Sequence, residues 1–446
     1  MSDTIAAIAT ASGVSSISIV RISGTDAKTI ARQIAPKASF RPRYSDLVSL
    51  YNKSGEMIDY ALVVYFQNPH SFSGEDTIEF QCHGGMIVVQ EILESAMHYG
   101  ARLAEPGEFS KRAFLNGKID LCEAEAIAKL IEAKSLDAAK ILARQLKGDL
   151  GEFVEQSREA LLRALAYSEV MIDYAEEDMP SDILDQLMSQ LETISNQMIQ
   201  VVQSSHRRRG LIDGFRVAII GKPNVGKSSL LNALLSYERA IVSEIAGTTR
   251  DTIEEQVRIG SHVIKMIDTA GIRDANDQIE RIGIERSMRS VKESDVVIVL
   301  FDGSALFDNE DQKIMDILEE NSDKEWIVAI TKSDLDRTFD IRKLQPFSPI
   351  KISIKQQFQN LTNALEERLD SIGESDELML VSARQIEAVE RCYDEIKLSQ
   401  NPLKNGELEF FSYHLKEAIK YISTITRPHE NEEILDKIFG EFCLGK

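Results

Sequence analysis

The sequence predicts a chain of several domains: an N-terminal α+β domain, an all-α helical domain, and a doubly wound α/β domain inserted into the helical one. Its 446 residues are too many for one ordinary core. Strand-like and helix-like segments alternate between residues 214 and 372, whereas helical periodicity dominates from residue 119 up to that stretch and returns after residue 374. We therefore expect the domains 1–117, 118–212, 213–373 and 374–446, of which the second and fourth are the two halves of one helical domain.

The amino-acid composition is that of a globular protein that does not span a membrane. Hydrophobic residues make up 43% and charged residues 28% of the chain, as in globular proteins. No apolar run is long enough to span a bilayer and no signal-peptide pattern opens the sequence, so we expect a cytoplasmic protein without a membrane partner. The four cysteines lack the paired spacing of a disulfide framework or a zinc site.

The formal net charge of −21 bears on nucleic-acid binding. A broad grip on phosphates needs clustered lysines and arginines, so any RNA contact would need a local basic patch or a basic partner protein. The basic run at 206–210 is expected to be a solvated linker, with contact to RNA phosphates as the alternative interpretation.

The N-terminal segment has the alternating pattern of strands at 16–22, 61–66 and 76–81, followed by an amphipathic helix at about 86–99. Apolar residues then recur at helical spacing from residue 119, through 150–174 and 183–202, and again at 380–398, 407–425 and 434–442. The expected strands of the α/β domain are 216–220, 252–259, 262–267, 295–301, 326–330 and 349–353.

The stretch 221–229 has the spacing G-x-x-x-x-G-K-S between an apolar strand and a helix. In such a loop the backbone N–H groups turn onto phosphates and the helix N-terminus adds positive potential. Lys227 is expected to reach the terminal phosphates and Ser228 to ligate Mg²⁺. The alternative is a glycine-rich turn that happens to precede a helix. The expected nucleotide-binding residues here are Asn224, Val225, Gly226, Lys227, Ser228 and Ser229.

Two further motifs follow strands of the same domain. The tetrad Asp268, Thr269, Ala270 and Gly271 is typical of a Mg²⁺-associated carboxylate and an N–H group that senses the γ-phosphate. The tetrad from Thr331 through Lys332 to Asp334 offers a carboxylate that can accept the N1–H and N2–H₂ donors of guanine, a donor pair that adenine lacks. Thr331 stands where such motifs usually have Asn, which puts the bracing of this loop in question.

Residues 243–251 lie between the glycine-rich loop and Asp268, and Thr249 is expected to close over Mg²⁺ and the γ-phosphate. The alternative is a Gly-Thr turn before a strand. Ile272 follows the second motif where many GTPases have a glutamine that orients water, so hydrolysis needs another polar side chain. Composition does not choose among the candidates Asp274, Asp277, Glu280 and Glu285.

Taken together, these motifs resemble the family of bacterial tRNA uridine-modification GTPases called MnmE or TrmE, over essentially the whole chain. The resemblance rests on 221–229, 245–251, 268–273 and 279–285 within the α/β domain. Outside that domain it rests on 74–77, 83–85, 105–110, 112–116 and 442–446.

The resemblance implies an N-terminal folate-binding and dimerisation domain, a helical domain and an inserted Ras-like P-loop GTPase domain. It implies a homodimer that hydrolyses GTP with Mg²⁺ and K⁺ and works with a flavin-containing partner, MnmG. Together they would add a carboxymethylaminomethyl or aminomethyl group to C5 of the wobble uridine of certain tRNAs. The one-carbon unit would come from a reduced folate, 5,10-methylene- or 5-formyl-tetrahydrofolate.

The resemblance also implies roles for single residues. Glu280 falls on the catalytic glutamate of the family, Ser228 and Thr249 would ligate Mg²⁺, and Cys443 is a candidate for a part in one-carbon transfer. K⁺ would be held by Asn224, Ser243, Ile245 and Thr248. The implied folate-binding residues are Arg21, Glu79, Lys118 and Lys446. The GTP-binding set would gain Ser243, Glu244, Ile245, Ala246, Gly247, Thr248 and Thr249.

Two other functions are consistent with the motifs. One is a regulatory or assembly-factor GTPase whose flanking domains only bind partners; it would have no use for a reduced folate. The other is a folate-dependent methyltransferase with a merely regulatory GTPase domain, which would keep transferring carbon after Glu280→Ala.

Overall fold

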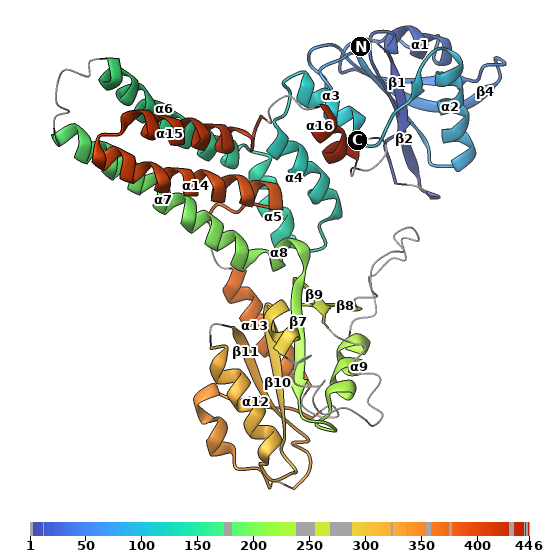
Figure 1. The fold of residues 1–446 in the computed structure, drawn as a ribbon. Helices are drawn as coiled ribbons and strands as arrows, with labels where there is room; N and C mark the ends of the chain where they lie inside the picture. The colour runs from blue at the N-terminus through green and yellow to red at the C-terminus, as the bar shows by residue number, and fades with distance from the viewer. Residues whose placement is uncertain are drawn as a thin grey trace. The chain divides into compact units, whose positions relative to one another are not determined.

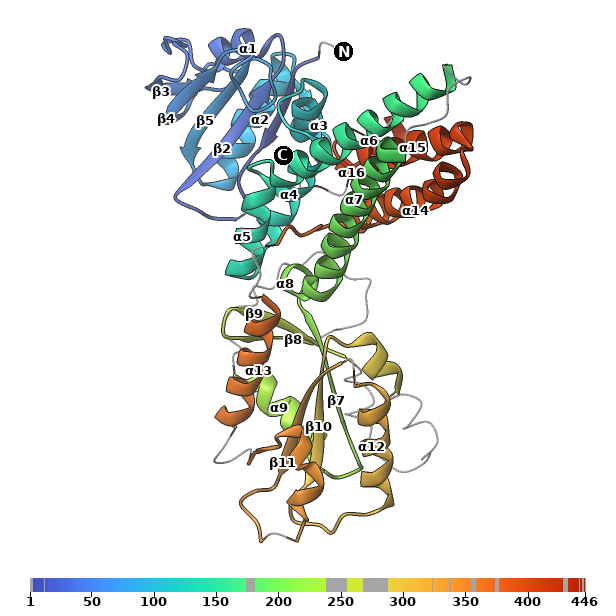
Figure 2. The same ribbon diagram turned by 90° about the vertical axis from the view of Figure 1, so that its left-hand side faces the viewer.

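The computed structural model describes residues 3–11, 13–173, 181–237, 255–267, 288–322, 324–336, 338–353, 358–373, 377–427, 432–440, 442 and 445. The chain forms two compact units, each built from segments distant in sequence. One unit contains Met1–Ile131, Gln145–Asp178 and Asn401–Lys446, and the other contains Glu132–Arg144 and Met179–Gln400. Figures 1 and 2 show the helices and sheets that make up each of them.

A six-stranded sheet organises the first unit, in the order β3-β4-β5-β2-β1-β6. All neighbouring strands are antiparallel except β1 and β6. The helices α1 (Ala27–Ile34) and α2 (Met86–His98) cover one face, where Phe80, Ile22 and Ile92 lie in a single core. The strands are β1 (Ile5–Ile8), β2 (Ile17–Ser23), β3 (Ser45–Tyr51), β4 (Met57–Phe66), β5 (Thr77–His83) and β6 (Arg102–Leu103).

The first unit also contains helices that come after the sheet strands in the sequence. The helices α6 (Asp149–Asp173) and α15 (Leu408–Ser423) lie side by side, joined by a 2.6 Å hydrogen bond between the hydroxyls of Ser168 and Ser412 (Figure 1). The helix α16 (Glu432–Gly440) packs Phe439 against α4 (Leu121–Glu132). Gly107, just before α3 (Glu108–Leu115), has φ 66°, and an added Cβ would stand 2.3 Å from the carbonyl oxygen of Phe439. Only glycine fits this turn.

The second unit contains the other six-stranded sheet, in the order β12-β11-β10-β7-β9-β8. All neighbouring pairs are parallel except the hairpin of β8 and β9. Every residue of β10 is buried, as expected of a strand covered on both faces. The strands are β7 (Phe215–Gly221), β8 (Glu255–Ile259), β9 (His262–Met266), β10 (Val296–Asp302), β11 (Glu325–Thr331) and β12 (Ile350–Lys351).

Helices cover both faces of this sheet. On one face α9 (Lys227–Tyr237) and α13 (Gln359–Gly373) contribute leucines to a core with β7 and β9. On the other face α12 (Asn309–Glu320) and the 3₁₀ helix η1 (Ile341–Phe347) pack against β10 and β11. Figure 2 shows α13 and α12 on opposite sides of the sheet. This is the doubly wound α/β arrangement that the sequence predicts.

Further helices in the described part of the chain are α7 (Ser181–Arg208) and α8 (Gly210–Asp213) in the second unit. The helices α5 (Leu136–Gln145) and α14 (Ala383–Asn405) belong to that unit up to Arg144 and Gln400. The prediction of a solvated linker at 206–210 is wrong, because α7 continues to Arg208 and α8 begins at Gly210. Arg208 is buried and donates to the carbonyl oxygen of Glu377 at 3.0 Å. A Cβ on Gly210 would stand 2.2 Å from the ring of Phe215. The connection from α7 through α8 to β7 is therefore held in place by close packing and is not a solvated linker.

The predicted fold class is confirmed, and the predicted strands of both sheets agree with the structure to within a few residues. The prediction gave no range for β1, β3, β6, α1, α3, α12 or α13, and α14 extends beyond the predicted end at residue 398, through Pro402. The bounds of the four predicted domain segments stay predictions. No helix within the described ranges is both long and apolar enough to cross a bilayer.

Candidate functional site

The loop between β7 and α9 has a backbone path that depends on left-handed residues. Asn224 (φ 61°) and Gly226 (φ 109°) both adopt such a conformation. A Cβ on Gly221 would stand 2.8 Å from the carbonyl oxygen of Leu300 and 2.9 Å from Cγ1 of Val225. Residue 221 therefore has to be a glycine for the loop to leave the sheet close to β10. We call residues 221–229 the phosphate-binding loop.

Lys227 is held by the loop itself. Its Nζ donates to the carbonyl oxygens of Gly221 at 2.6 Å and Lys222 at 2.9 Å. An ammonium has three N–H donors, so one of them is left for a ligand. Burial lowers the pKa of Lys227 against the opposing effect of Glu310, and an anion bound in the loop would favour the charged form again.

The start of α9 adds a second source of positive potential. Lys227 is the first residue of this helix of 11 residues, and Leu230 N–H already donates to Gly226 at 2.9 Å. The free N–H groups of a first helical turn, together with the helix dipole, favour an anion. Ser228 is half-buried and Ser229 exposed in that turn. A hydroxyl there can contribute one ligand to a Mg²⁺ that takes its other ligands from phosphates and water.

Thr331 connects the base-recognition motif to the phosphate-binding loop. It is buried at the end of β11, and its Oγ1 lies 2.8 Å from the carbonyl oxygen of Val225 and 3.2 Å from that of Phe301. A hydroxyl is the donor that a buried carbonyl needs. Threonine therefore supplies the loop bracing that the absence of asparagine had put in question.

The residues after Thr331 expose a carboxylate. Lys332 (φ 54°) turns the chain and donates to Oδ2 of Asp302 at 2.6 Å. Partial burial raises the pKa of Asp302, but the hydrogen bonds from Lys332 and Ser304 outweigh it, and that pKa lies below its usual range. Asp334 is exposed, and no hydrogen bond to its carboxylate comes from the described part of the chain. It is available as an acceptor for a base.

The rest of the predicted nucleotide site lies outside the described residues. This applies to the predicted catalytic residue Glu280 and to two whole segments. The residues concerned are Ser243, Glu244, Ile245, Ala246, Gly247, Thr248, Thr249, Asp268, Thr269, Ala270 and Gly271. Within the ranges that are described, no three His, Cys, Asp or Glu side chains come together as a metal site.

The predicted folate residues Arg21 and Glu79 are cross-strand neighbours on β2 and β5. Nε of Arg21 donates to Oε1 of Glu79 at 2.9 Å, and the guanidinium lies over the ring of Phe109, 5.5 Å from its centre. Both side chains lie on the sheet face opposite α1 and α2, since the intervening positions Val20 and Phe80 belong to the core on the helical side. Their pairing leaves the remaining carboxylate and guanidinium edges for a polar ligand.

The other two predicted folate residues come from different parts of the chain. Lys118 is exposed, and its stem lies beside Gly74, where an added Cβ would be 3.2 Å from Cε of Lys118. Lys446 and Cys443 lie outside the described residues, but Gly445 is buried against β1, where a Cβ would be 2.2 Å from the carbonyl oxygen of Ile8. Ile8 is the last residue of β1, and its neighbour Ala7 is the register partner of Arg21 on β2. Gly445 therefore lies against β1, the strand that pairs with the strand of Arg21.

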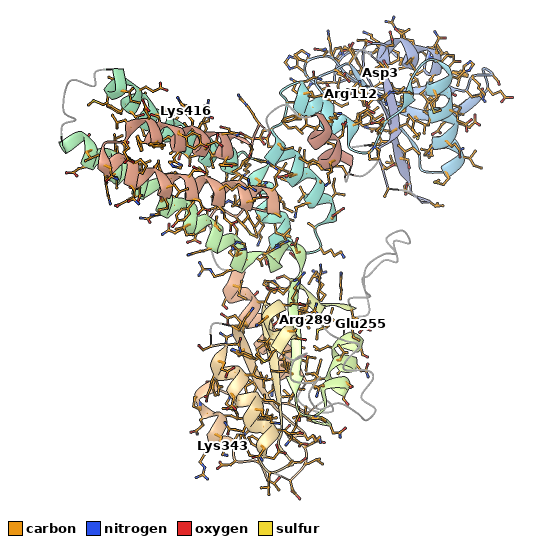
Figure 3. All side chains as sticks on the ribbon, in the orientation of Figure 1. Asp3, Arg112, Glu255, Arg289, Lys343 and Lys416 are labelled. Atoms are coloured by element: carbon orange, nitrogen blue, oxygen red, sulfur yellow. The ribbon has the colours of Figure 1, made fainter. Side chains whose placement is uncertain are left out.

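An ionic network in the same unit was not predicted as such. Arg112 of α3 donates to Oδ1 of Asp3 at 2.8 Å, and both residues are labelled in Figure 3. Arg112 also donates to Oε1 of Glu108 at 2.9 Å and to both oxygens of Glu75 at 3.1 Å. Arg102 forms a two-pronged pair with Glu108 at 2.6 and 2.8 Å. The network connects the sequence segments 74–77, 105–110 and 112–116. These segments therefore have a structural role, in addition to any role of the predicted folate residues.

Burial raises the pKa of Glu108, but hydrogen bonds from Arg102, the Glu105 N–H group and Arg112 outweigh it and hold that pKa below its ordinary value. The pKa of Asp3 is lowered chiefly by its hydrogen bond with Arg102. Both carboxylates are therefore ionised at neutral pH and bind the arginines as charged groups.

Two family models match the sequence. One, described as MnmE helical domain, matches residues 121–443, and the other, described as GTP-binding protein TrmE N-terminus, matches residues 4–118. Curated relatives that match over the full length of this chain carry the name tRNA modification GTPase MnmE, among them the two that follow. The protein from Sulfurovum sp. (strain NBC37-1) is 64% identical over 446 residues, which are 100% of this chain and 99% of the relative. The protein from Aliarcobacter butzleri (strain RM4018) is 56% identical, with 100% and 99% covered.

A solved structure, the FeoB G-domain from Methanococcus jannaschii, matches 35% of this chain and 98% of that one at 20% identity and a TM-score of 0.25. At that score the assignment to a family has to rest on the sequence relatives.

We predict that Thr331→Val lowers the free energy of unfolding of the second unit by about 1–3 kcal/mol, because the buried carbonyl of Val225 loses its donor. Thr331→Ser keeps the hydroxyl and is the matched control. The fluorescence of Trp326, the one tryptophan of the chain and a residue of β11, follows unfolding of this sheet. Equal stability of the valine and serine variants would contradict the bracing role.

We predict that the first unit loses stability in acid. A carboxyl whose pKa is lower in the folded than in the unfolded state stabilises the fold above its unfolded pKa, and this contribution disappears as the pH falls through the folded pKa. Glu108→Gln should lower the free energy of unfolding by about 2–4 kcal/mol at neutral pH, and it should make the loss of stability with falling pH less steep. Hydrogen exchange of β2 and β5 measures both effects. Glu94→Gln, on the exposed side of α2, should leave the profile unchanged; a similar profile for both variants would rule out the network as its source.

Proposed function

The chain belongs to the MnmE family of tRNA modification GTPases, and on that premise we propose that it is the GTP-hydrolysing component of a complex that modifies the wobble uridine of certain tRNAs. The proposed product is a carboxymethylaminomethyl or aminomethyl group on C5 of that uridine. The observation that carries the GTPase part is the loop 221–229, in which Lys227 is held by two carbonyl oxygens with one N–H to spare.

Binding of GTP would use the groups already in place. The third N–H of Lys227 and the first turn of α9 would receive the phosphates, and the carboxylate of Asp334 would accept the N1–H and N2–H₂ groups of guanine. Bound Mg²⁺, with Ser228 and Thr249 as the proposed protein ligands, would neutralise charge that develops on the phosphates. Glu280 is the proposed residue that orients the attacking water, since Ile272 cannot.

K⁺ is the proposed second cation of the reaction, held by Asn224, Ser243, Ile245 and Thr248. The left-handed conformation of Asn224 and its exposure in the loop that carries Lys227 support this role for one of the four. A monovalent cation in that place would offset negative charge in the transition state, as an arginine does in other GTPases.

A reduced folate is the proposed source of the one-carbon unit. The pair of Arg21 and Glu79 supports this, because a carboxylate suits the donor edge of a pterin. Lys118 and Lys446 would bind the anionic tail. The burial of Gly445 on β1, next to the strand of Arg21, supports a contribution of the C-terminal motif, including Cys443.

The partners in this proposal are a second copy of the chain, the flavin-containing MnmG and tRNA. Support for the homodimer comes from the sheet face opposite α1 and α2, where Leu47 and Leu62 are register partners and are 53% and 37% exposed. Tyr60 and Ile17 on the same face are 52% and 63% exposed. The net charge of −21 supports a basic partner protein as the main source of contact with tRNA.

We predict that cells lacking this chain contain wobble uridines without the C5 modification. Nucleoside analysis of their tRNA measures it, and the wild-type chain should restore the modification while Lys227→Ala should not. If the uridines were unchanged although the purified chain binds GTP, a regulatory or assembly-factor GTPase would be the better description. Continued modification with Glu280→Ala would instead favour the methyltransferase with a regulatory domain.

We predict that GTP hydrolysis is faster in K⁺ than in Na⁺ by at least about 10-fold, because only the larger cation fits a site built for it and stabilises the developing charge. Asn224→Ala should abolish the difference. Initial rates at matched ionic strength measure it. Equal rates of the wild-type chain in the two salts would remove the cation from the mechanism.

A further inference from the structure

Lys222, the second residue of the phosphate-binding loop, binds its ammonium to the start of α12. Its Nζ donates to Oδ2 of Asp308 at 2.8 Å and to Oδ2 of Asp311 at 2.7 Å. The side chain of Lys222 is only 9% exposed. Burial disfavours its charged form, but the two carboxylates outweigh burial and raise its pKa. The phosphate-binding loop is therefore held to α12 by ion pairs of the nearly buried Lys222 with Asp308 and Asp311.

The two carboxylates are themselves fixed by the helix. Asp308 is the N-cap of α12 and accepts the N–H groups of Glu310 at 2.9 Å and Asp311 at 3.0 Å, while Asp311 accepts the N–H of Asp308 at 3.1 Å. Asp311 is fully buried, and its Oδ1 has no hydrogen-bond partner in the described part of the chain. Since this buried carboxylate has Lys222 as its cation, α12 and the loop cannot separate without a large loss of electrostatic energy.

The backbone of Lys222 has a different partner. Its carbonyl oxygen accepts from Nζ of Lys227, together with the carbonyl oxygen of Gly221. The side chain of Lys222 therefore faces α12 while its carbonyl sets the direction of the lysine that reaches the phosphates. A displaced carbonyl at residue 222 would turn the free N–H of Lys227 away from its target.

We propose that Lys222 is a positioning residue for GTP hydrolysis, which rests on the function proposed above. It anchors residue 222 to α12 through Asp308 and Asp311 and so holds Nζ of Lys227 in line with the phosphates. A purely structural ion pair would stabilise the domain but would leave kcat and KM of the folded molecules unchanged. The positioning role predicts a change in both.

The test uses the full chain with Mg²⁺ and GTP. Lys222→Met keeps the length of the stem and removes the charge, and it should lower kcat/KM roughly 10- to 100-fold, as a displacement of about 1 Å at a catalytic group does. Lys222→Arg should recover most of the rate. Lys313→Met, which removes a charge from the exposed side of α12, is the matched control and should keep wild-type constants.

A double variant separates the positioning role from stability. In Lys222→Met with Asp311→Asn no buried carboxylate is left without a cation, so the thermal midpoint should return toward that of the wild type while kcat/KM stays low. Recovery of both quantities would overturn the proposal, and so would a folded Lys222→Met with unchanged kcat and KM. A wild-type chain that hydrolyses no GTP would instead refute the proposed function, which is a distinguishable result.

Discussion

The phosphate-binding loop can act only while Lys227 stays on the carbonyl oxygens of Gly221 and Lys222, and contacts outside the loop keep those carbonyls in place. The loop leaves the sheet so close to β10 that residue 221 has no room for a side chain. Thr331 binds the carbonyl of Val225 from β11, and Lys222 binds the N-cap of α12. Three elements that carry no phosphate ligand therefore determine where the ammonium points, which is the preorganisation that electrostatic catalysis needs.

In the first unit, contacts between charged side chains likewise fix the positions of neighbouring elements, but there they stabilise the fold. Arg112 and Arg102 are enclosed by Asp3, Glu75 and Glu108, so the positions of α3 and the N-terminal strand depend on one network. On the face of the sheet opposite α1 and α2, Arg21 and Glu79 form a simpler pair with unused hydrogen-bonding edges. A saturated network stabilises the fold, whereas an unsaturated pair is suited to a ligand. This contrast supports the assignment of Arg21 and Glu79, and not of Arg112, to the proposed folate site.

The sequence was most informative where an apolar strand ends in a motif. β7, β10 and β11 are continuous apolar runs, and the spacing of the residues after β7 and β11 predicts a nucleotide-binding role for them. β1 was missed because it has only four residues, and β3 because its alternation is weak and half-exposed. The run 206–210 was misjudged because its arginines suggested solvent, although the stem of Arg208 is buried in a continuing helix. The contacts of Lys222 with Asp311 and of Thr331 with Val225 join residues 89 and 106 positions apart, and no local pattern can reveal such pairs.

The proposed function depends on the binding of a guanine nucleotide to the loop between β7 and α9, through Lys227 and Asp334. Isothermal titration calorimetry of the purified chain with Mg²⁺-GTP and with Mg²⁺-ATP tests it most directly. We expect one GTP per chain and no measurable binding of ATP at the same concentrations, because adenine offers no donor pair to the carboxylate of Asp334. Equal binding of the two nucleotides, or no binding of GTP at all, would contradict it.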